Sequence, residues 1–167
     1  MTRSQGSSAS TSATELLRLD KQLCFALYST SLTMTKLYKP VLARLGLTYP
    51  QYLVMLALWE SSPQTVSDLG ARLFLDSGTL TPLLKRMQTS GWITRDRDAA
   101  DERRVRVGLT DSGRALRERA TRIPRDVARA ARCSPGEITD LTRRLQQLRA
   151  AIADGPAASA PSLAAAG

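Results

Sequence analysis

The stretch TVSDLGARLFLDSGTLTPLLKRMQTSGW, residues 65–92, decides the fold. Its first part begins at Thr65, and Asp68 follows three residues later, a spacing close to the capping box that starts many helices. Its second part begins at Asp76 or Ser77, both of which are good helix caps, and should end at the glycine of TSGW. Two short helices joined by a tight turn predict a helix-turn-helix.

A β-hairpin is expected directly after the second helix. WITRDRD, residues 92–98, is followed by a short polar stretch and then by RRVRVGL, residues 103–109. In the latter, Val105, Val107 and Leu109 alternate with polar or small residues, which is the period of a strand. A hairpin in this position makes the unit a winged helix-turn-helix.

The helix expected over residues 76–90 has two different faces. Leu80, Leu83, Leu84 and Met87 share one face and should pack inward. Hydroxyl and cationic side chains suited to base edges and phosphates lie opposite: Ser77, Thr79, Thr81, Pro82, Lys85 and Arg86. An ordinary solvated face would look similar, but the hairpin behind the helix favours binding to double-stranded DNA.

The hairpin is rich in arginine, and an arginine at its tip suits the minor groove of DNA. Acidic residues alternate with these arginines, so we expect several to be paired within the protein. The candidate DNA contacts of the wing are Arg95, Arg97, Arg103 and Arg104.

Helices flank this reader on both sides. We expect one helix over residues 14–46, a buried helix at 49–60, a long helix from Thr110 or Asp111 that Pro124 interrupts, and a last helix at 134–153. The last helix has a stripe of large apolar residues, which fits either a subunit interface or packing on its own domain: Ile138, Leu141, Leu145, Leu148 and Ile152.

These elements predict a mainly α-helical fold with a small β-wing and an intertwined homodimer held by the N- and C-terminal helices. The expected organisation has five parts. They are a disordered arm (1–13), a dimerisation and sensor helix (14–48), the winged helix-turn-helix (49–110), C-terminal dimerisation helices (111–154) and a disordered tail (155–167).

Composition narrows the function. The net charge is +9, from 24 Lys and Arg against 15 Asp and Glu, which favours a polyanionic partner. The sequence has no histidine, so histidine-ligated metal sites and histidine-dependent triads are excluded, and we expect no metal and no cofactor. There is neither a long apolar run nor a secretory signal, so we expect a cytoplasmic protein without a membrane segment.

One of the two cysteines, Cys24, lies in QLCFALYS, residues 22–29, with Tyr28 one helical turn away. Free cysteines usually pack as small apolar side chains, so the spacing alone leaves open whether Cys24 packs or reacts. Its neighbours, including Phe25, are apolar and would favour a ligand with an alkyl or acyl tail.

Several motifs together carry a resemblance. LCFALY (23–28), TKLYKP (35–40), LTYPQY (47–52), LDSGTLTPLLKRM (75–87) and DERRV (101–105) resemble the MarR family of dimeric winged-helix regulators, and in particular its OhrR-type repressors, which sense organic hydroperoxides. The resemblance runs from about residue 15 to residue 150. It implies a repressor, not an enzyme such as a thiol peroxidase, that controls a peroxide-detoxification gene.

The resemblance also implies residue roles. The family's sensing cysteine falls on Cys24, and the tyrosines that surround it fall on Tyr28, Tyr38 and Tyr49. The family's resolving cysteine, which belongs to the other subunit, falls on Cys133. The family's wing arginine falls on Arg103. Oxidised Cys24 would become a sulfenic acid and then a disulfide between subunits.

Tyr38 is 14 residues from Cys24, which is about 21 Å along a straight helix. If Tyr38 serves Cys24, either the helix bends back or the partner subunit supplies the tyrosine, and an antiparallel crossing of two such helices is the simpler geometry. The alternative for a regulator of this fold is release by a non-covalent phenolic or aromatic ligand bound among the tyrosines.

Overall fold

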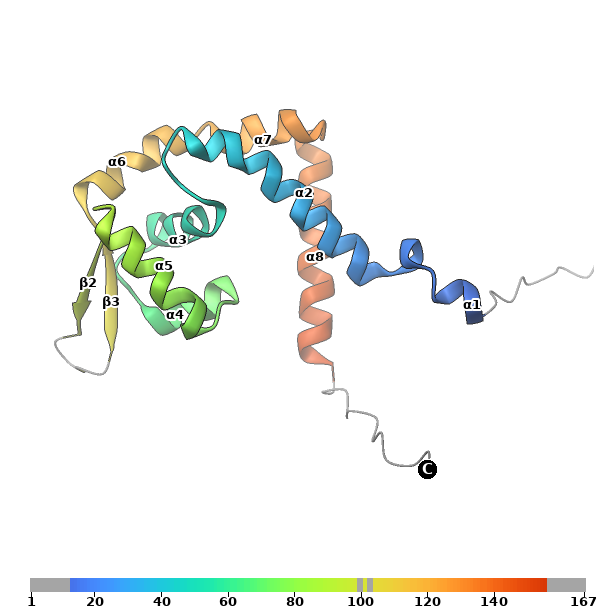
Figure 1. Ribbon diagram of the computed structural model, residues 1–167, viewed down its shortest axis with the longest axis horizontal. Helices are drawn as coiled ribbons and strands as arrows, with labels where there is room; N and C mark the ends of the chain where they lie inside the picture. Colours follow the sequence, from blue (N-terminus) through green and yellow to red (C-terminus); the bar gives the residue numbers. More distant parts are fainter. Residues whose placement is uncertain (1–12, 99–100, 102–103, 156–167) are drawn as a thin grey trace, which may run out of the picture. The chain divides into compact units, whose positions relative to one another are not determined.

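The predicted helix-turn-helix is present in the computed structural model, which describes residues 13–98, 101 and 104–155. It consists of α4 (Val66–Leu73) and α5 (Ser77–Thr89), which pack against each other (Figure 1). The Thr65 hydroxyl accepts a hydrogen bond from the Asp68 N–H, and the Asp76 carboxylate caps α5 in the same way. Both predicted helix starts are therefore confirmed.

Residues with left-handed backbone end both helices. Phe74 has φ 55°, and the next residue, Leu75, donates its N–H to the Gly70 carbonyl at 3.0 Å. Gly91 has φ 74°, and Trp92 donates its N–H to the carbonyl of Met87 at 3.2 Å. These bonds satisfy carbonyls that a helix end leaves without a donor, and they turn the chain sharply out of each helix.

The wing is formed by β2 (Ile93–Arg97) and β3 (Val105–Leu109), paired antiparallel with Ile93 opposite Leu109. A third strand that the sequence did not reveal, β1 (Gln64–Thr65), pairs with β3 on its other side. Ile93 and Val107 are buried and fix the sheet to the helices.

Helix α6 (Asp111–Ala120) begins directly against the start of the wing. Gly113 is required there, because a Cβ at this position would lie 2.0 Å from the Trp92 carbonyl oxygen. Trp59 donates its indole N–H to the Gly113 carbonyl at 2.9 Å, and Thr110 donates its hydroxyl to the Gly91 carbonyl. The beginning and end of the hairpin are thereby held together.

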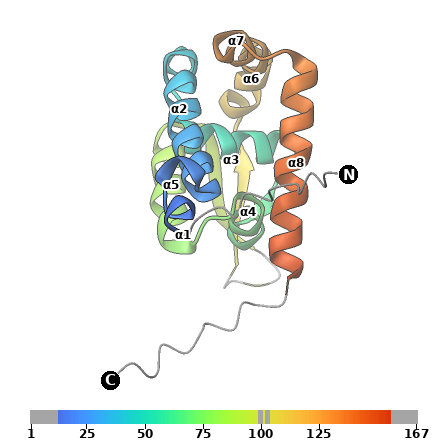
Figure 2. The ribbon, with the colours of Figure 1, turned by 90° about the vertical axis from the view of Figure 1, so that its right-hand side faces the viewer.

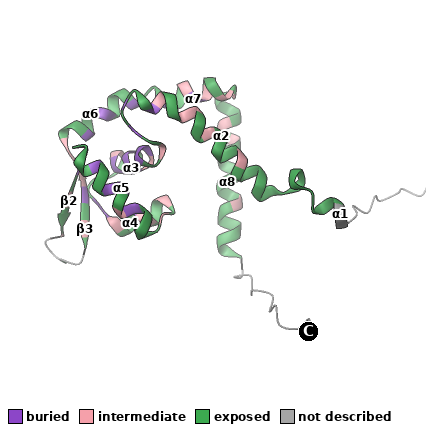
Figure 3. Cartoon of the chain, viewed as in Figure 1, coloured by how far each residue is buried: buried purple, intermediate pink, exposed green. Residues whose placement is uncertain are grey.

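Helix α3 (Tyr49–Glu60) is the centre of the core. It packs against α2, α4, α5 and α6 (Figure 2), and much of it is buried (Figure 3). Val54, Met55 and Leu58 are almost fully buried. A capping box between Thr48 and Gln51 starts it. The prediction of a buried helix at 49–60 is confirmed.

The prediction of one helix over residues 14–46 is wrong. The chain forms α1 (Ala13–Leu16), a short 3-10 helix η1 (Leu19–Lys21) and then α2 (Leu23–Ala43). Gln22, between η1 and α2, is extended, with ψ 116°, and its side-chain amide donates to the carbonyls of Leu16 and Arg18. The leucines on either side of the break, Leu16, Leu19 and Leu23, are exposed on this chain, so no packing enforces a single helix there.

The chain divides into two compact units between Thr121 and Arg122. The second contains α7 (Ile123–Ala131) and α8 (Pro135–Asp154). Pro124 lies in the first turn of α7, so the predicted interruption is confirmed. Three residues of the predicted α8 stripe are exposed: Leu141, Leu145 and Ile152.

The predicted arm and tail lie outside the described residues, apart from Ala13 and Gly155. Among the helices that are described, none is long and apolar enough to cross a membrane.

Candidate nucleic-acid interface and thiol site

Helix α5 presents a polar face to solvent. Its inward side chains, Leu80, Leu83, Leu84 and Met87, are buried. The predicted reader residues lie opposite: Ser77, Thr79, Pro82, Lys85 and Arg86 are exposed, and Thr81 is half-buried. Because proline has no N–H, Pro82 also leaves the Gly78 carbonyl at the start of α5 without its helical donor.

The first turn of α5 is held by its cap. The Thr79 N–H and the Thr79 hydroxyl both donate to the Asp76 carboxylate, each at 2.8 Å. These bonds hold the pKa of Asp76 below its usual value, with the backbone N–H of Thr79 as the largest cause. Thr79, predicted only as a DNA contact, is therefore also a capping residue, and its methyl group and hydroxyl lone pairs remain for a ligand.

The arginines of the wing differ in their exposure and in their partners. Arg97 and Arg104 are exposed, whereas Arg95 is half-buried and its Nε has no hydrogen-bond partner among the described residues. Arg106 forms an ion pair with Asp98 at 3.5 Å, which agrees with the expectation that some arginines are paired internally. Arg103, the predicted minor-groove residue, lies outside the described residues.

Cys24 is exposed and is the second residue of α2. The correct start of α2 therefore moves this thiol from the middle of a helix to its first turn. The first N–H groups of a helix have no acceptor within it, and the positive end of the helix dipole favours negative charge there. Tyr28 lies one turn further along and is 62% exposed, and Phe25 and Leu27 are also exposed.

Two of the predicted tyrosines lie elsewhere. The rings of Tyr38, on α2, and Tyr49, on α3, are 4.8 Å apart between centroids. Tyr52 lies 6.0 Å from Tyr38 and 6.3 Å from Trp59, which extends the cluster into the core. Burial raises the pKa of all three phenols, that of Tyr52 to about 12.

Sequence reasoning missed Tyr52 and Trp59. The available signal was their spacing, because residues 49, 52 and 59 fall near one face of a helix.

One chain does not assemble the whole predicted site. Helix α2 is continuous from Leu23 to Ala43, so Cys24 and Tyr38 are separated by about 21 Å along its axis. The structure thus brings Cys24 near Tyr28, and Tyr38 near Tyr49, but it does not bring the two pairs together within a chain.

Cys133 lies in the short connection between α7 and α8 and is half-buried. Its N–H donates to the Ala128 carbonyl at 3.3 Å, after Arg132 with φ 55°, and its thiol lies 3.4 Å from the Ala131 carbonyl oxygen. The predicted resolving cysteine is thus placed where a turn, not a helix, carries it.

Comparisons with known proteins agree with this architecture. A family model described as transcriptional regulator SarA/Rot matches residues 36–119. An organic hydroperoxide resistance transcriptional regulator of Bacillus subtilis (strain 168) is 48% identical over 132 residues, which are 79% of this chain and 90% of that one.

Two solved structures of the regulator AbfR, a protein of Staphylococcus epidermidis, are also similar. Reduced AbfR bound to DNA has a TM-score of 0.68 and 36% identity, over 84% of this chain and 99% of that one. Disulfide-formed AbfR has a TM-score of 0.55 and 40% identity, over 81% and 95%.

The chain belongs to the MarR family of winged-helix transcriptional regulators. Within that family it is similar to the organic hydroperoxide resistance regulators, as its motifs predicted, and the predicted mainly α-helical winged-helix fold is confirmed. The intertwined homodimer stays a prediction.

Proposed function

We propose that this protein is a dimeric repressor that binds operator DNA and releases it when an organic hydroperoxide oxidises Cys24. The observation that carries the proposal is the exposed position of Cys24 in the first turn of α2, on a chain whose α5 presents an exposed polar face beside a wing.

The DNA-binding part rests on shape and charge. Helix α5 is long enough to lie in a major groove, and its hydroxyls and cations suit base edges and phosphates. The wing arginines Arg97 and Arg104 are exposed, so they are accessible to the neighbouring backbone or minor groove. The net charge of +9 supplies the long-range attraction. AbfR, a relative of the same fold, has been solved bound to DNA.

The redox part begins with attack of the Cys24 thiolate on the terminal oxygen of the hydroperoxide. The O–O bond breaks, the organic part leaves as an alcohol after taking up a proton, and the sulfur becomes a sulfenic acid. Exposure gives the peroxide access, and the first turn of α2 favours the negative charge of the thiolate. Phe25 and Leu27 offer apolar contact to the organic tail of the substrate.

Cys133 of the partner subunit would then condense with the sulfenic acid. An S–S bond forms, the S–O bond breaks and water leaves. AbfR has been solved in a disulfide form, which supports this step by analogy. Closure requires the two Cα atoms to come within about 7 Å, so the disulfide imposes a definite geometry on the dimer.

The dimer is proposed because the chain leaves much apolar surface uncovered. Exposed large apolar side chains lie on α2 (Leu23, Leu32) and on α8 (Leu141, Leu145, Ile152). An antiparallel crossing of two α2 helices would bring the Tyr38 and Tyr49 of one subunit towards Cys24 of the other. In that arrangement the phenols donate hydrogen bonds to the thiolate.

The test is operator release. A duplex selected by the wild-type protein from a random-sequence pool is bound, and cumene hydroperoxide is added. We expect the wild type to release the duplex and recover it after a dithiol reductant, and Cys24→Ser to bind normally without release. Release by Cys24→Ser would contradict the proposal. Release of a variant lacking both cysteines by a phenolic ligand would favour the non-covalent alternative.

A further inference from the structure

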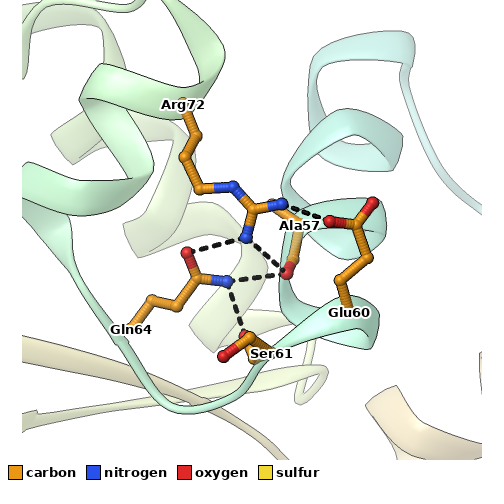
Figure 4. Close-up of polar contacts among 5 residues, drawn as sticks. All are labelled: Ala57, Glu60, Ser61, Gln64 and Arg72. Atoms are coloured by element: carbon orange, nitrogen blue, oxygen red, sulfur yellow. Dashed lines mark hydrogen bonds and ion pairs between the residues drawn. The ribbon is translucent and has the colours of Figure 1, made fainter.

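Arg72, near the end of α4, joins three elements of the first unit (Figure 4). Its guanidinium donates to the Ala57 carbonyl of α3 at 3.3 Å and to the Gln64 side-chain carbonyl of β1 at 3.1 Å. It also forms an ion pair with Glu60, the last residue of α3. One side chain therefore contacts the end of α3 and the start of the wing sheet while it belongs to the helix-turn-helix.

Gln64 completes the arrangement. Its amide N–H₂ donates to the Ala57 carbonyl at 2.6 Å and to the Ser61 carbonyl, so it caps the C-terminal end of α3. Its backbone pairs with Val107 of β3, and its side chain is buried. We call Ala57, Glu60, Ser61, Gln64 and Arg72 the α3 clamp.

The α3 clamp fixes the two DNA-reading elements relative to each other. Helix α5 packs on α4, which carries Arg72, and the wing strand β3 pairs with β1, which carries Gln64. The guanidinium is a rigid planar fork, so it sets an angle as well as a distance between α4 and β1. None of the clamp residues lies on the predicted reader face of α5.

We propose that Arg72 is a positioning residue that keeps α5 and the wing in the one relative placement that fits operator DNA. This inference rests on the proposed function, because it presupposes sequence-specific DNA binding. The same helix α3 carries Tyr49 and Tyr52 at its other end, so the α3 clamp is also where a movement of α3 would reach both reading elements.

The expected loss of operator affinity follows from the fraction of molecules in which α5 and the wing have the fitting arrangement. Without the guanidinium, Gln64 loses the donor to its buried side-chain carbonyl, and α4 and β1 can adopt other relative positions. If the fitting arrangement falls to about a tenth of the molecules, the operator Kd rises about tenfold. Binding to unrelated DNA depends on charge and not on the relative placement of the two elements, so it should not change.

The experiment measures affinity for the selected operator duplex and for a scrambled duplex, each over a series of salt concentrations. The variants are Arg72→Met, Arg72→Lys, Glu60→Gln and, as a matched control, Arg117→Met on the exposed surface of α6. Near-ultraviolet circular dichroism and thermal unfolding establish that each variant is folded at the assay temperature.

We expect Arg72→Met to lose about tenfold in operator affinity with an unchanged salt slope and unchanged affinity for the scrambled duplex. Arg72→Lys keeps the charge but not the fork, so it should lose about threefold. Glu60→Gln removes only a largely exposed ion pair and should behave like Arg117→Met.

Three results would overturn the proposal. The first is unchanged operator affinity in Arg72→Met, and the second is wild-type operator affinity in Arg72→Lys. The third is an equal loss of affinity of Arg72→Met for both duplexes with a shallower salt slope, which would make Arg72 a direct phosphate contact. If Arg72→Met does not fold, Arg72→Lys decides between these outcomes. A wild type with no preference for any duplex would refute the proposed function itself, and the inference with it.

Discussion

Lys85 offers the sharpest test of how α5 meets DNA. It is exposed on the polar face of α5, next in sequence to Leu84, which is fully buried on the opposite face. In the proposed major-groove orientation its ammonium group reaches a phosphate of the DNA backbone. Each phosphate contact contributes about 0.9 to the slope of log K against log salt concentration. A dimer carries two copies of Lys85, so Lys85→Met should reduce the slope by about 1.8.

Methionine keeps an unbranched side chain with good helix propensity, so the free energy of unfolding should change by less than about 0.5 kcal/mol. Fluorescence anisotropy of a labelled operator duplex, titrated at several salt concentrations, gives the slope directly. Arg117→Met, which removes an exposed charge from α6, should leave the slope unchanged. An unchanged slope in Lys85→Met would refute the orientation of α5, and an equal change in both variants would show that only net charge matters.

Further predictions concern stability and titration. Leu84→Ala should lower the free energy of unfolding by about 2–5 kcal/mol in urea, whereas Leu16→Ala, at an exposed position, should change it little in the same assay. Hydrogen bonds hold the pKa of Asp76 below its usual 3.8, so its capping contribution is present above that pH and is lost as the pH falls through the lower folded value. Asp76→Asn should keep the cap and remove this part of the acid dependence, as followed by urea unfolding at several pH values. Tyr52, with a pKa of about 12, should ionise later than an unburied phenol when phenolate absorbance is followed at rising pH, and the stability it contributes is lost as the pH rises from its unfolded value near 10 through 12.

The features that could be predicted from the sequence are those encoded locally. The caps at Thr65 and Asp76 depend on hydrogen bonds three residues away, and a short window of sequence contains both partners. The alternation in β3 and the apolar face of α5 are likewise periodic within one element. The helix-turn-helix and wing were therefore predicted with nearly correct boundaries.

The features that were missed depend on contacts between distant residues. Strand β1 has two residues and exists only because it pairs with β3, some 40 positions later. The contacts of Arg72 with Ala57 and Gln64 carry no periodic signal. The break at Gln22 was missed for the opposite reason, since the leucine spacing was helical but the leucines on either side of the break, Leu16, Leu19 and Leu23, are exposed.

The break at Gln22 matters for the chemistry of Cys24. A helix running from residue 14 would have left Cys24 inside it, with its neighbouring N–H groups already bonded. The structure instead places the thiol in the first turn of α2. The candidate site is thus best described as a helix start with an exposed thiol, which in the proposed dimer would be completed by residues of a second subunit.

The central claim is that oxidation of Cys24 and loss of operator binding are the same event. Samples of the wild-type protein are treated with increasing cumene hydroperoxide, and each is divided between mass spectrometry of Cys24 and Cys133 peptides and an operator-binding assay. We expect the fraction of unmodified Cys24 and the fraction of protein able to bind the operator to fall together. Full binding after complete oxidation of Cys24, or release while Cys24 remains a free thiol, would contradict it.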